Sequence, residues 1–179
     1  RETSKNAIQR IKDMDVEIVM LTGDNEIVAE AIGKKMNIDI VHANLKPSDK
    51  CDEIKRLQQD GNVVGMIGDG INDAPALATA DVSFAIGTAT EIAMEAANIT
   101  LVKGDITKAW EALRLSRQTM KIIKQNLFWA FGYNVIAIPF AALGLLNPMI
   151  AAGAMAFSSV SVVTNSLRLR RFKLESDKK

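Results

Sequence analysis

Three observations predict an α/β fold with a parallel sheet covered by helices on both faces, followed by a helical hairpin. Short apolar runs alternate with segments of helical periodicity over residues 1–105. Polar turns rich in Gly and Asp follow two of these runs. Residues 126–167 contain no Asp, Glu, Lys or Arg. Alternating strands and helices build βαβ units, whereas a long uncharged stretch needs a bilayer or a large core to bury it.

The elements of the α/β part follow in chain order. Apolar residues at helical spacing predict helices, and short apolar runs bounded by Gly, Asp or Pro predict buried strands. The predicted helices span residues 3–13, 25–36, 50–59, 74–79 and 90–97, and the predicted strands span residues 17–21, 38–41, 62–67, 82–86 and 99–102. Because ligands bind at the carboxyl ends of parallel strands, we expect the turns at Asp24 and Asp69 to carry functional groups.

Composition excludes several classes of protein. The 179 residues have a net charge of +1, which gives no argument for nucleic-acid binding. One cysteine, Cys51, excludes an internal disulfide framework, and one histidine, His42, is too few for a histidine-rich metal site. We expect both to be ordinary residues. No signal peptide opens the chain, and Arg1 rather than Met enters the first predicted helix, so we expect part of a longer polypeptide.

The most specific string is GDGINDAPAL at residues 68–77. Asp69 and Asp73 lie four residues apart, with Asn72 between them. Carboxylate and amide oxygens suit Mg²⁺, which keeps substrate phosphate among its ligands. The flanking glycines would let the backbone approach a phosphoryl group. A polar turn explains GDG by itself but not ten residues in this order, so the string predicts a site for magnesium and phosphate.

Two other positions allow more than one interpretation. In Thr22-Gly23-Asp24 the hydroxyl and the backbone amides could hold a phosphoryl oxygen, or Asp24 could cap the next helix. Lys50 lies near a helix start signalled by Pro47-Ser48-Asp49. A solvated surface lysine is the ordinary reading of Lys50. Its charge opposes the helix dipole at that end, however, which indicates another purpose.

TGDN at 22–25, LKPSDK at 45–50 and GDGINDAPAL at 68–77 resemble successive motifs of the P-type ATPase phosphorylation domain, within the haloacid dehalogenase superfamily. The resemblance implies a haloacid-dehalogenase-like parallel sheet. It also implies contact with the phosphoryl group, neutralisation of its charge by the lysine, and binding of Mg²⁺ by the aspartates. The catalytic residues so implied are Thr22, Gly23, Asp24, Lys50 and Asn72, and the magnesium ligands are Asp69 and Asp73.

The departure from the family pattern limits what the chain can do. The family's phospho-acceptor aspartate lies in a DKTGT string, which does not occur here. The nucleotide-binding domain, which would bind most of the ATP, and the actuator domain are missing as well. We therefore expect residues 1–105 to be the C-terminal part of a phosphorylation domain, and the chain alone to be inactive.

Residues 126–167 read as two transmembrane helices. Asn126–Leu146 would extend roughly 31 Å as a helix, and Met149–Leu167 is of similar length, with Asn147-Pro148 as the turn. A buried helix pair in a soluble protein is the alternative. Basic residues flank the spans and none lies in the turn, so both ends are expected to be cytoplasmic: Lys121, Lys124, Arg168, Arg170, Arg171 and Lys173. Residues 106–125 would be a stalk helix and 168–179 a basic cytoplasmic tail.

Polar side chains within the spans point to the transported ion. Polar and small residues such as Ser158 can serve the packing of membrane helices against each other. Alternatively, polar side chains at this depth line a transport path. Neither span holds a carboxylate, and a thioether such as Met155 suits Cu(I). The Tyr-Asn pair and Met-x-x-Ser-Ser resemble the last two helices of copper-exporting pumps, where an earlier Cys-Pro-Cys, absent here, supplies thiolates. The metal-binding residues so implied are Met155, Tyr133, Asn134 and Ser159.

The predicted function is therefore part of an ATP-driven Cu(I)-exporting P-type pump. Such a pump is a multi-pass protein of the cell membrane, with Mg²⁺ and ATP as cofactors and with the bilayer, Cu(I) and a copper chaperone as partners. Three alternatives remain: a pump for silver or another soft metal, an inactive membrane-anchored module with a regulatory or interaction role, and a soluble phosphatase with a membrane anchor. A DKTGT and a Cys-Pro-Cys encoded upstream of Arg1 would favour the pump.

Overall fold

The computed structural model describes residues 2–69, 71–86, 91–101, 105–144 and 148–172. The chain divides into two compact units, Arg1–Trp110 and Glu111–Lys179. The elements, in order, are α1 (Glu2–Lys12), β1 (Val19–Leu21), α2 (Glu26–Met36), β2 (Ile40–His42), α3 (Pro47–Gln59), β3 (Gly65–Gly68), the 3₁₀ turn η1 (Ile71–Asp73), α4 (Ala74–Thr79), β4 (Val82–Ile86), α5 (Glu91–Ala96), β5 (Ile99–Leu101), α6 (Thr107–Ala142), α7 (Pro148–Leu167) and η2 (Arg168–Arg171). The predicted alternation of strands and helices is confirmed.

All strand pairs are parallel, as predicted, and within the described residues the strands form a two-stranded and a three-stranded sheet. β1 pairs with β2, with Val19 opposite Ile40. β3, β4 and β5 form the second sheet, with β4 in the centre. In the described part of the chain no strand pairs with both β1 and β3, so each of these two strands has a single neighbour. The predicted parallel α/β pattern is therefore confirmed, with an open position beside β1 and another beside β3 in the described part of the chain.

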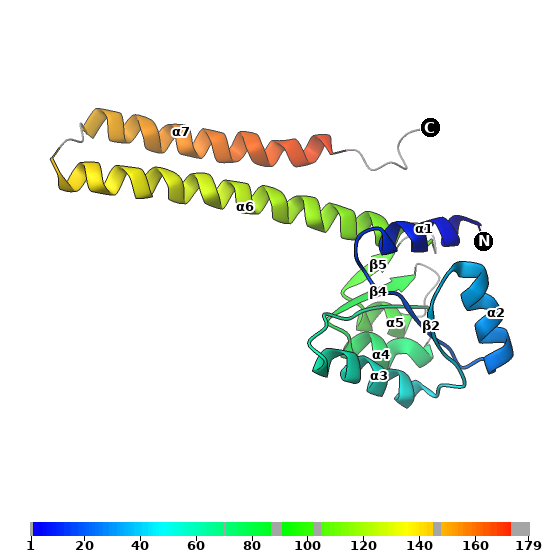
Figure 1. Cartoon of the computed structure of the whole chain (residues 1–179). Helices are drawn as coiled ribbons and strands as arrows, with labels where there is room; N and C mark the ends of the chain where they lie inside the picture. Colours follow the sequence, from blue (N-terminus) through cyan, green and yellow to red (C-terminus); the bar gives the residue numbers. More distant parts are fainter. Residues whose placement is uncertain (1, 70, 87–90, 102–104, 145–147, 173–179) are drawn as a thin grey trace. The chain divides into compact units, whose positions relative to one another are not determined.

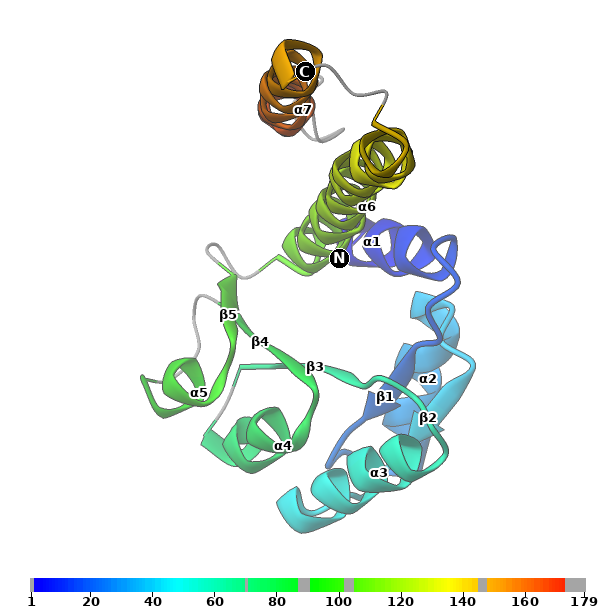
Figure 2. The same ribbon diagram turned by 90° about the vertical axis from the view of Figure 1, so that its left-hand side faces the viewer.

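Helices cover the strands from two sides. Figures 1 and 2 show α3, α4 and α5 together on one side of the β3–β4–β5 sheet, with α1 on the other side. Leu77 of α4 and Ala85 of β4 are buried against each other, with Met66 packed beside them. In the central strand Ser83, Phe84 and Ala85 are all buried. A strand buried on both faces reads as a continuous apolar run, and this is why β4 is recognisable in the sequence.

The helix α2 is defined by local chemistry at both ends. The side chain of Asn25 accepts a hydrogen bond of 3.0 Å from the backbone N–H of Val28, which caps the first turn. At the other end Asn37 adopts the left-handed conformation with φ 61°. Between them, a Cβ at Gly33 would lie 2.6 Å from Cγ2 of Val41, so only glycine lets α2 pack this closely on β2.

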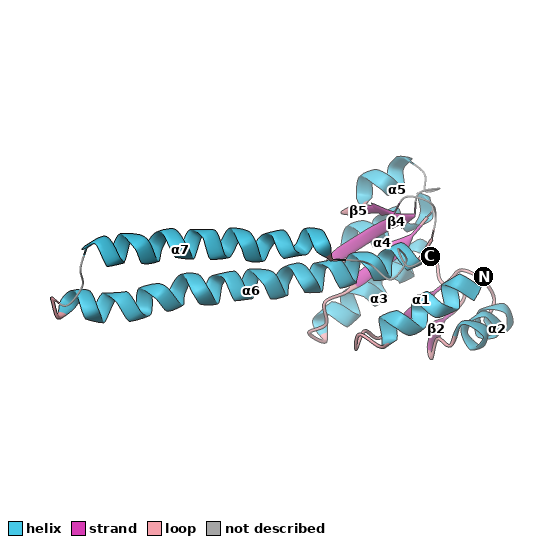
Figure 3. Cartoon of the chain, turned by 90° about the horizontal axis from the view of Figure 1, so that it is seen from above, coloured by secondary structure: helices cyan, strands magenta, loops and turns pink. Residues whose placement is uncertain are grey.

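In the second unit α6 and α7 lie side by side and antiparallel (Figures 1 and 3). Polar side chains join them at one end. Asn165 donates to Oδ1 of Asn126 at 2.9 Å and to Oε1 of Gln125 at 3.3 Å, and Asn126 donates to Oγ of Ser166 at 2.9 Å. These bonds fix the register of the two helices. The segments predicted as stalk and first span are one continuous helix.

The turn of the hairpin differs from the prediction. The helix α6 ends at Ala142, before the predicted end at Leu146, because Gly144 adopts a left-handed φ of 69° that ends a helix. Pro148, predicted as part of the turn, begins α7, a position where proline loses no hydrogen bond. Predictions at Gly70, Thr90, Val102, Asn147 and residues 173–179 lie outside the described residues.

Within the described ranges, no helix combines the length and the apolar character that crossing a membrane requires. The transmembrane hairpin predicted for residues 126–167 is thus not confirmed.

Candidate functional site

The central contact of the candidate site is an ion pair between two of the sequence motifs. Nζ of Lys50, in the first turns of α3, lies 2.7 Å from Oδ1 of Asp73, which ends the 3₁₀ turn after β3. The two side chains are only 14% and 15% exposed. The reading of Lys50 as a solvated surface lysine is therefore wrong. This lysine is held where it neutralises negative charge beside β3.

The loop after β1 is held by the loop after β2. The backbone N–H of Leu45 donates to the carbonyl of Thr22 at 3.0 Å, and that of Asn44 donates to the carbonyl of Asp24 at 2.8 Å. Within the loop, Oγ1 of Thr22 lies 3.0 Å from a carboxylate oxygen of Asp24 and accepts from the Asp24 backbone N–H at 3.1 Å. Asp24 does not cap α2, because Asn25 does. The capping interpretation of Asp24 is wrong.

These bonds connect all three motifs. The first motif, at Thr22, is bonded to Leu45, where the second motif begins. The second motif enters α3, whose start is fixed by the Asp49 carboxylate accepting from the backbone N–H of Lys46 at 2.8 Å. One turn further on, Lys50 reaches Asp73 of the third motif. A continuous series of contacts thus connects residues from three separate parts of the sequence.

Gly68 has a more specific reason to be glycine than the sequence indicated. A Cβ at this position would lie 2.7 Å from Cβ of Asp73 and 3.2 Å from its carboxylate. The absent side chain therefore makes room for the aspartate that pairs with Lys50. Close approach of a phosphoryl group, the reason predicted from the sequence, is not needed to explain this glycine.

The donor set at the end of β3 fits Mg²⁺. Asp69 follows Gly68 directly and is exposed, with no hydrogen-bonding partner in the described part of the chain. Asn72 is also exposed, while Asp73 has one carboxylate oxygen bonded to Lys50. Among the described residues there is no group of three or more His, Cys, Asp or Glu able to hold a metal. A hard cation that takes one or two carboxylates and completes its shell with water and phosphate matches this set.

A second cluster lies on the same helix as Lys50. Glu53 accepts two hydrogen bonds from Arg56, at 2.7 Å and 3.0 Å, and lies 3.5 Å from Nε2 of His42. Hydrogen bonds from the Arg56 guanidinium, and then its positive charge, hold the pKa of the Glu53 carboxyl below its ordinary value of 4.5, against the opposing effect of burial. The cluster ties β2 to α3.

The chain should lose part of its stability in acid through this cluster. A carboxyl with a lowered pKa in the folded state adds stability above its unfolded pKa, and that stability is lost as the pH falls below about 4.5 and through the lowered value. Between about pH 7 and pH 3 we expect the thermal unfolding midpoint of Glu53→Gln to fall less than that of the parent chain. This pH range, roughly, is the one in which the Glu53 carboxyl takes up its proton in the parent chain. Asp52→Asn, at a carboxylate that is 76% exposed, is the control. Equal acid sensitivity of Glu53→Gln and the parent chain would contradict this role.

The residues predicted to bind the transported metal lie on α6 and α7 without converging. Met155 is 71% exposed. The Asn134 amide donates to the carbonyl of Ala130 at 2.8 Å, and Oγ of Ser159 donates to the carbonyl of Met155 at 3.2 Å, so both bond within their own helix. The Tyr133 ring lies 6.2 Å from that of Trp129. Among the described contacts none joins these four side chains across the hairpin, and their role stays a prediction.

Asn44 is a residue of the site that the sequence analysis did not single out. It adopts a left-handed φ of 54° and its N–H holds the carbonyl of Asp24. Asparagine tolerates this conformation better than most residues. An Asn directly before the LKPSDK string was the available signal.

The fold and these contacts define the class. Parallel βαβ units with Asp-bearing turns at strand ends and a lysine at a helix start match a haloacid dehalogenase-like hydrolase, and the family model of that description covers residues 1–81. The described topology extends the same α/β pattern through β5.

The similar proteins narrow the class to a family. The chain is 57% identical over 173 residues to a copper-exporting P-type ATPase of Bacillus subtilis (strain 168), and 53% identical over 179 residues to one of Staphylococcus aureus (strain JH9). These alignments cover 97% and 100% of the chain but 22% of each relative. The chain is therefore homologous over its whole length to copper-exporting P-type ATPases and spans about a fifth of the length of these relatives.

Solved structures agree with this assignment. A zinc-transporting PIB-type ATPase in the E2.Pi state matches with a TM-score of 0.88 and 34% identity, over 94% of this chain and 28% of that one. The catalytic domain of a CPx-ATPase matches with a TM-score of 0.57 and 42% identity, over 60% of this chain and 43% of that one.

Proposed function

We propose that the chain is a segment of an ATP-driven Cu(I)-exporting P-type pump. It carries the magnesium and phosphate groups of the phosphorylation domain, a stalk and a membrane hairpin. The chain of contacts that joins Thr22, Leu45, Lys50 and Asp73 supports the phosphoryl-transfer half of this proposal. In such a pump, of which the chain would span about 22%, the nucleotide-binding part and the phospho-acceptor aspartate would come from other segments.

The open positions beside β1 and β3 support a place for that aspartate. β1 and β3 each have a single strand neighbour in the described part, and each ends in a candidate motif, at Thr22 and at Asp69. A strand from the remaining polypeptide that paired with both would end between these motifs. Thr22 and the Gly23 amide would then orient the phosphoryl oxygens, and Lys50 would neutralise their charge. Mg²⁺ held by Asp69, with Asp73 beside it, would supply further charge neutralisation.

The second unit is proposed to cross the membrane as a hairpin, with residues 106–125 as the stalk. Residues 126–167 carry no charged side chain, and many large apolar side chains there face outward, among them Phe131, Val135 and Phe157 at 61%, 69% and 73% exposure. Outward-facing apolar surface of this extent requires lipid or a partner. The positive charges of Lys121, Lys124 and Arg168–Arg171 support a cytoplasmic location for both ends of the hairpin.

Cu(I) is the proposed cargo. The hairpin offers a thioether at Met155 and amide and hydroxyl oxygens, but no carboxylate. Met155 and Ser159 share an exposed face of α7, which leaves both side chains open to ligands from other membrane helices. The curated relatives at 53–57% identity are named copper exporters, whereas the zinc-transporting match is 34% identical.

The metal assignment is tested with Met155→Ala in the intact pump that contains this chain. We expect Cu(I)-stimulated ATP hydrolysis to fall by about tenfold or more, as for loss of a metal-binding group. Phosphoenzyme formation from inorganic phosphate and Mg²⁺ should be retained, because Met155 is remote in sequence from the phosphate motifs. Measuring both activities separates metal binding from loss of fold.

Met149→Ala is the matched control, since Met149 lies on the same helix and is 84% exposed. It should leave Cu(I) stimulation within about twofold of the parent pump, because Met149 is not among the predicted metal ligands. Full Cu(I) activation of Met155→Ala would show that this thioether is not a ligand. Repeating the titration with Ag(I) tests whether the site separates the two soft cations.

A further inference from the structure

Positive charge is concentrated at one end of the α6–α7 hairpin. Between residues 112 and 172 the chain has no Asp or Glu and seven basic residues: Arg114, Arg117, Lys121, Lys124, Arg168, Arg170 and Arg171. The bonds of Asn126 with Asn165 and Ser166 place the end of α7 beside this part of α6. All seven therefore lie at the same end, where the apolar stretch begins.

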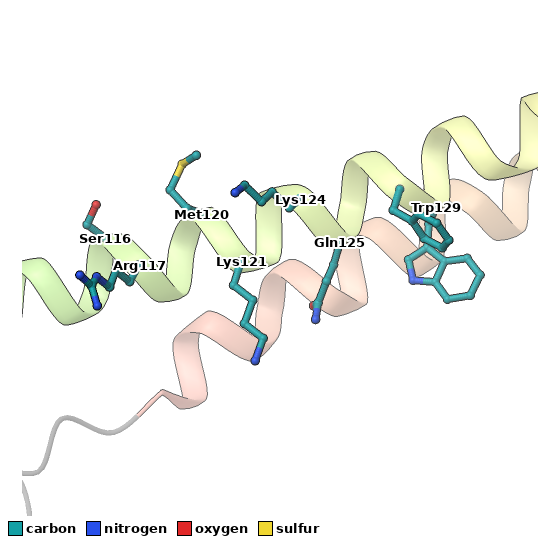
Figure 4. A pocket seen from close by; sticks show the side chains of 8 residues that line it. Ser116, Arg117, Met120, Lys121, Lys124, Gln125 and Trp129 are labelled. Carbon is teal, nitrogen blue, oxygen red and sulfur yellow. The ribbon is translucent and has the colours of Figure 1, made fainter. Parts of the chain in front are cut away.

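A groove of about 610 Å³ opens on this part of α6 (Figure 4). Its lining changes from cationic to aromatic along the helix and includes Arg117, Met120, Lys121, Lys124, Phe128 and Trp129. Figure 4 shows Lys121 extending from α6 toward the end of α7, with Gln125 and Trp129 following on successive turns. The groove thus has basic side chains toward one end and aromatic side chains toward the other along α6.

The two lysines of the groove are available to an anion. Lys121 and Lys124 are exposed, and neither forms an ion pair within the described ranges. Gln125 uses its amide oxygen to accept from Asn165, which leaves its amide nitrogen as a further donor. The Phe128 and Trp129 rings pack edge to face with centroids 5.6 Å apart and are 69% and 51% exposed. An indole half exposed beside lysines is typical of a membrane–water interface.

We propose that this groove binds the headgroup of an anionic phospholipid. Lys121 and Lys124 contact the headgroup phosphate, and Phe128 and Trp129 cover the first carbons of the acyl chains. The charge of the surface favours an anionic over a zwitterionic lipid, because the groove has cations and no carboxylate to meet a choline. The proposal rests on the membrane hairpin of the proposed function and adds a lipid preference to it.

The test is lipid binding by the purified chain in detergent micelles, measured by native mass spectrometry with added phosphatidylglycerol or phosphatidylcholine. A lysine near an anionic surface contributes about 1 kcal/mol, or roughly fivefold in affinity. We expect the preference for phosphatidylglycerol to fall about 30-fold in Lys121→Gln/Lys124→Gln, as two such contributions imply. Lys121→Arg/Lys124→Arg should retain it. Raising the salt concentration should weaken the preference of the parent chain, a readout that needs no variant.

Lys34→Gln/Lys35→Gln removes two cations from α2 and is the matched control, with an unchanged lipid preference expected. Equal binding of both lipids by the parent chain, or an unchanged preference in the Lys121/Lys124 variant, would overturn the proposal. So would equal competition by inorganic phosphate, which would assign the groove to a free anion. Insertion is measured separately, by protease protection of a tag placed in the turn after Gly144 in phosphatidylcholine vesicles. Loss of protection would overturn the hairpin, whereas protection without lipid preference would overturn only the headgroup site.

Discussion

Asp69→Ala in the intact pump should abolish phosphoenzyme formation from inorganic phosphate and Mg²⁺. Asp69 follows the buried Gly68 at the end of β3, and its carboxylate is exposed without a hydrogen-bonding partner among the described residues. A carboxylate in this state contributes little to folding and is available to a cation. Metal ions supply several kcal/mol of charge stabilisation to phosphoryl transfer, so we expect a loss of about 10³-fold or more.

The design separates this loss from misfolding. The thermal unfolding midpoint of Asp69→Ala should stay close to that of the parent pump, because the substitution removes no hydrogen bond or ion pair found among the described residues. Asp52→Ala, at an exposed aspartate on α3 whose only described ion pair is a 4.0 Å contact with Lys55, should keep full phosphorylation. Raising the Mg²⁺ concentration should not restore Asp69→Ala. Phosphoenzyme at the parent level in this variant would exclude Asp69 as a magnesium ligand.

Lys50→Gln should reduce both stability and phosphorylation. Its ammonium group lies 2.7 Å from Oδ1 of Asp73, and the two side chains are 14% and 15% exposed. Removing one partner of such a pair leaves a poorly solvated charge, which costs about 3–5 kcal/mol in a fully buried site and about 2 kcal/mol here, where some water reaches the pair. Loss of a cation aimed at a phosphoryl group should lower phosphorylation by about 10²-fold.

A double-mutant cycle separates the two effects. Lys50→Gln and Asp73→Asn should each destabilise the chain, and the double variant should be less destabilised than the sum, with a coupling of about 1–3 kcal/mol in urea unfolding. Its phosphorylation should nevertheless stay as low as that of Lys50→Gln, since the cation is still missing. Lys55→Gln, on the same helix and 58% exposed, is the matched control. Additive stabilities would mean that the pair seen at 2.7 Å contributes nothing to the fold.

The order of elements was predictable because each has a local cause. An apolar run such as Val82–Ile86 is stable when both of its faces are buried in a sheet. Pro47 favours the first turn of a helix because its backbone geometry fits there and no hydrogen bond is lost. The ends were less predictable. Gly144 stops α6 early by adopting a left-handed conformation, which the sequence permits but does not require. Strand β1 is shorter than the apolar run at 17–21 because pairing, not hydrophobicity, defines its ends.

The candidate site, too, has features that the sequence predicts and features that only the structure shows. The three motifs with their residue types were visible in the sequence, including Asp69 and Thr22. Three features were not visible. Lys50 pairs with Asp73 across 23 residues, Gly68 makes room for that aspartate, and Asn44 holds the loop of Asp24. Each of these features depends on the positions of α3 and of the strand ends. Those positions result from packing between residues far apart in the sequence, which local sequence patterns do not predict.

The sequence by itself determined the similarity to P-type ATPases, the parallel α/β pattern and the uncharged stretch at 126–167, because motif order, periodicity and composition are properties of the chain. Only the tertiary structure decided which strands pair, with β1 and β3 each lacking a second neighbour among the described residues. It also decided that Lys50 is covered and paired and that seven basic residues gather at one end of the hairpin. The physical reason is that charges and strand edges acquire partners only when the fold brings distant residues within a few ångströms.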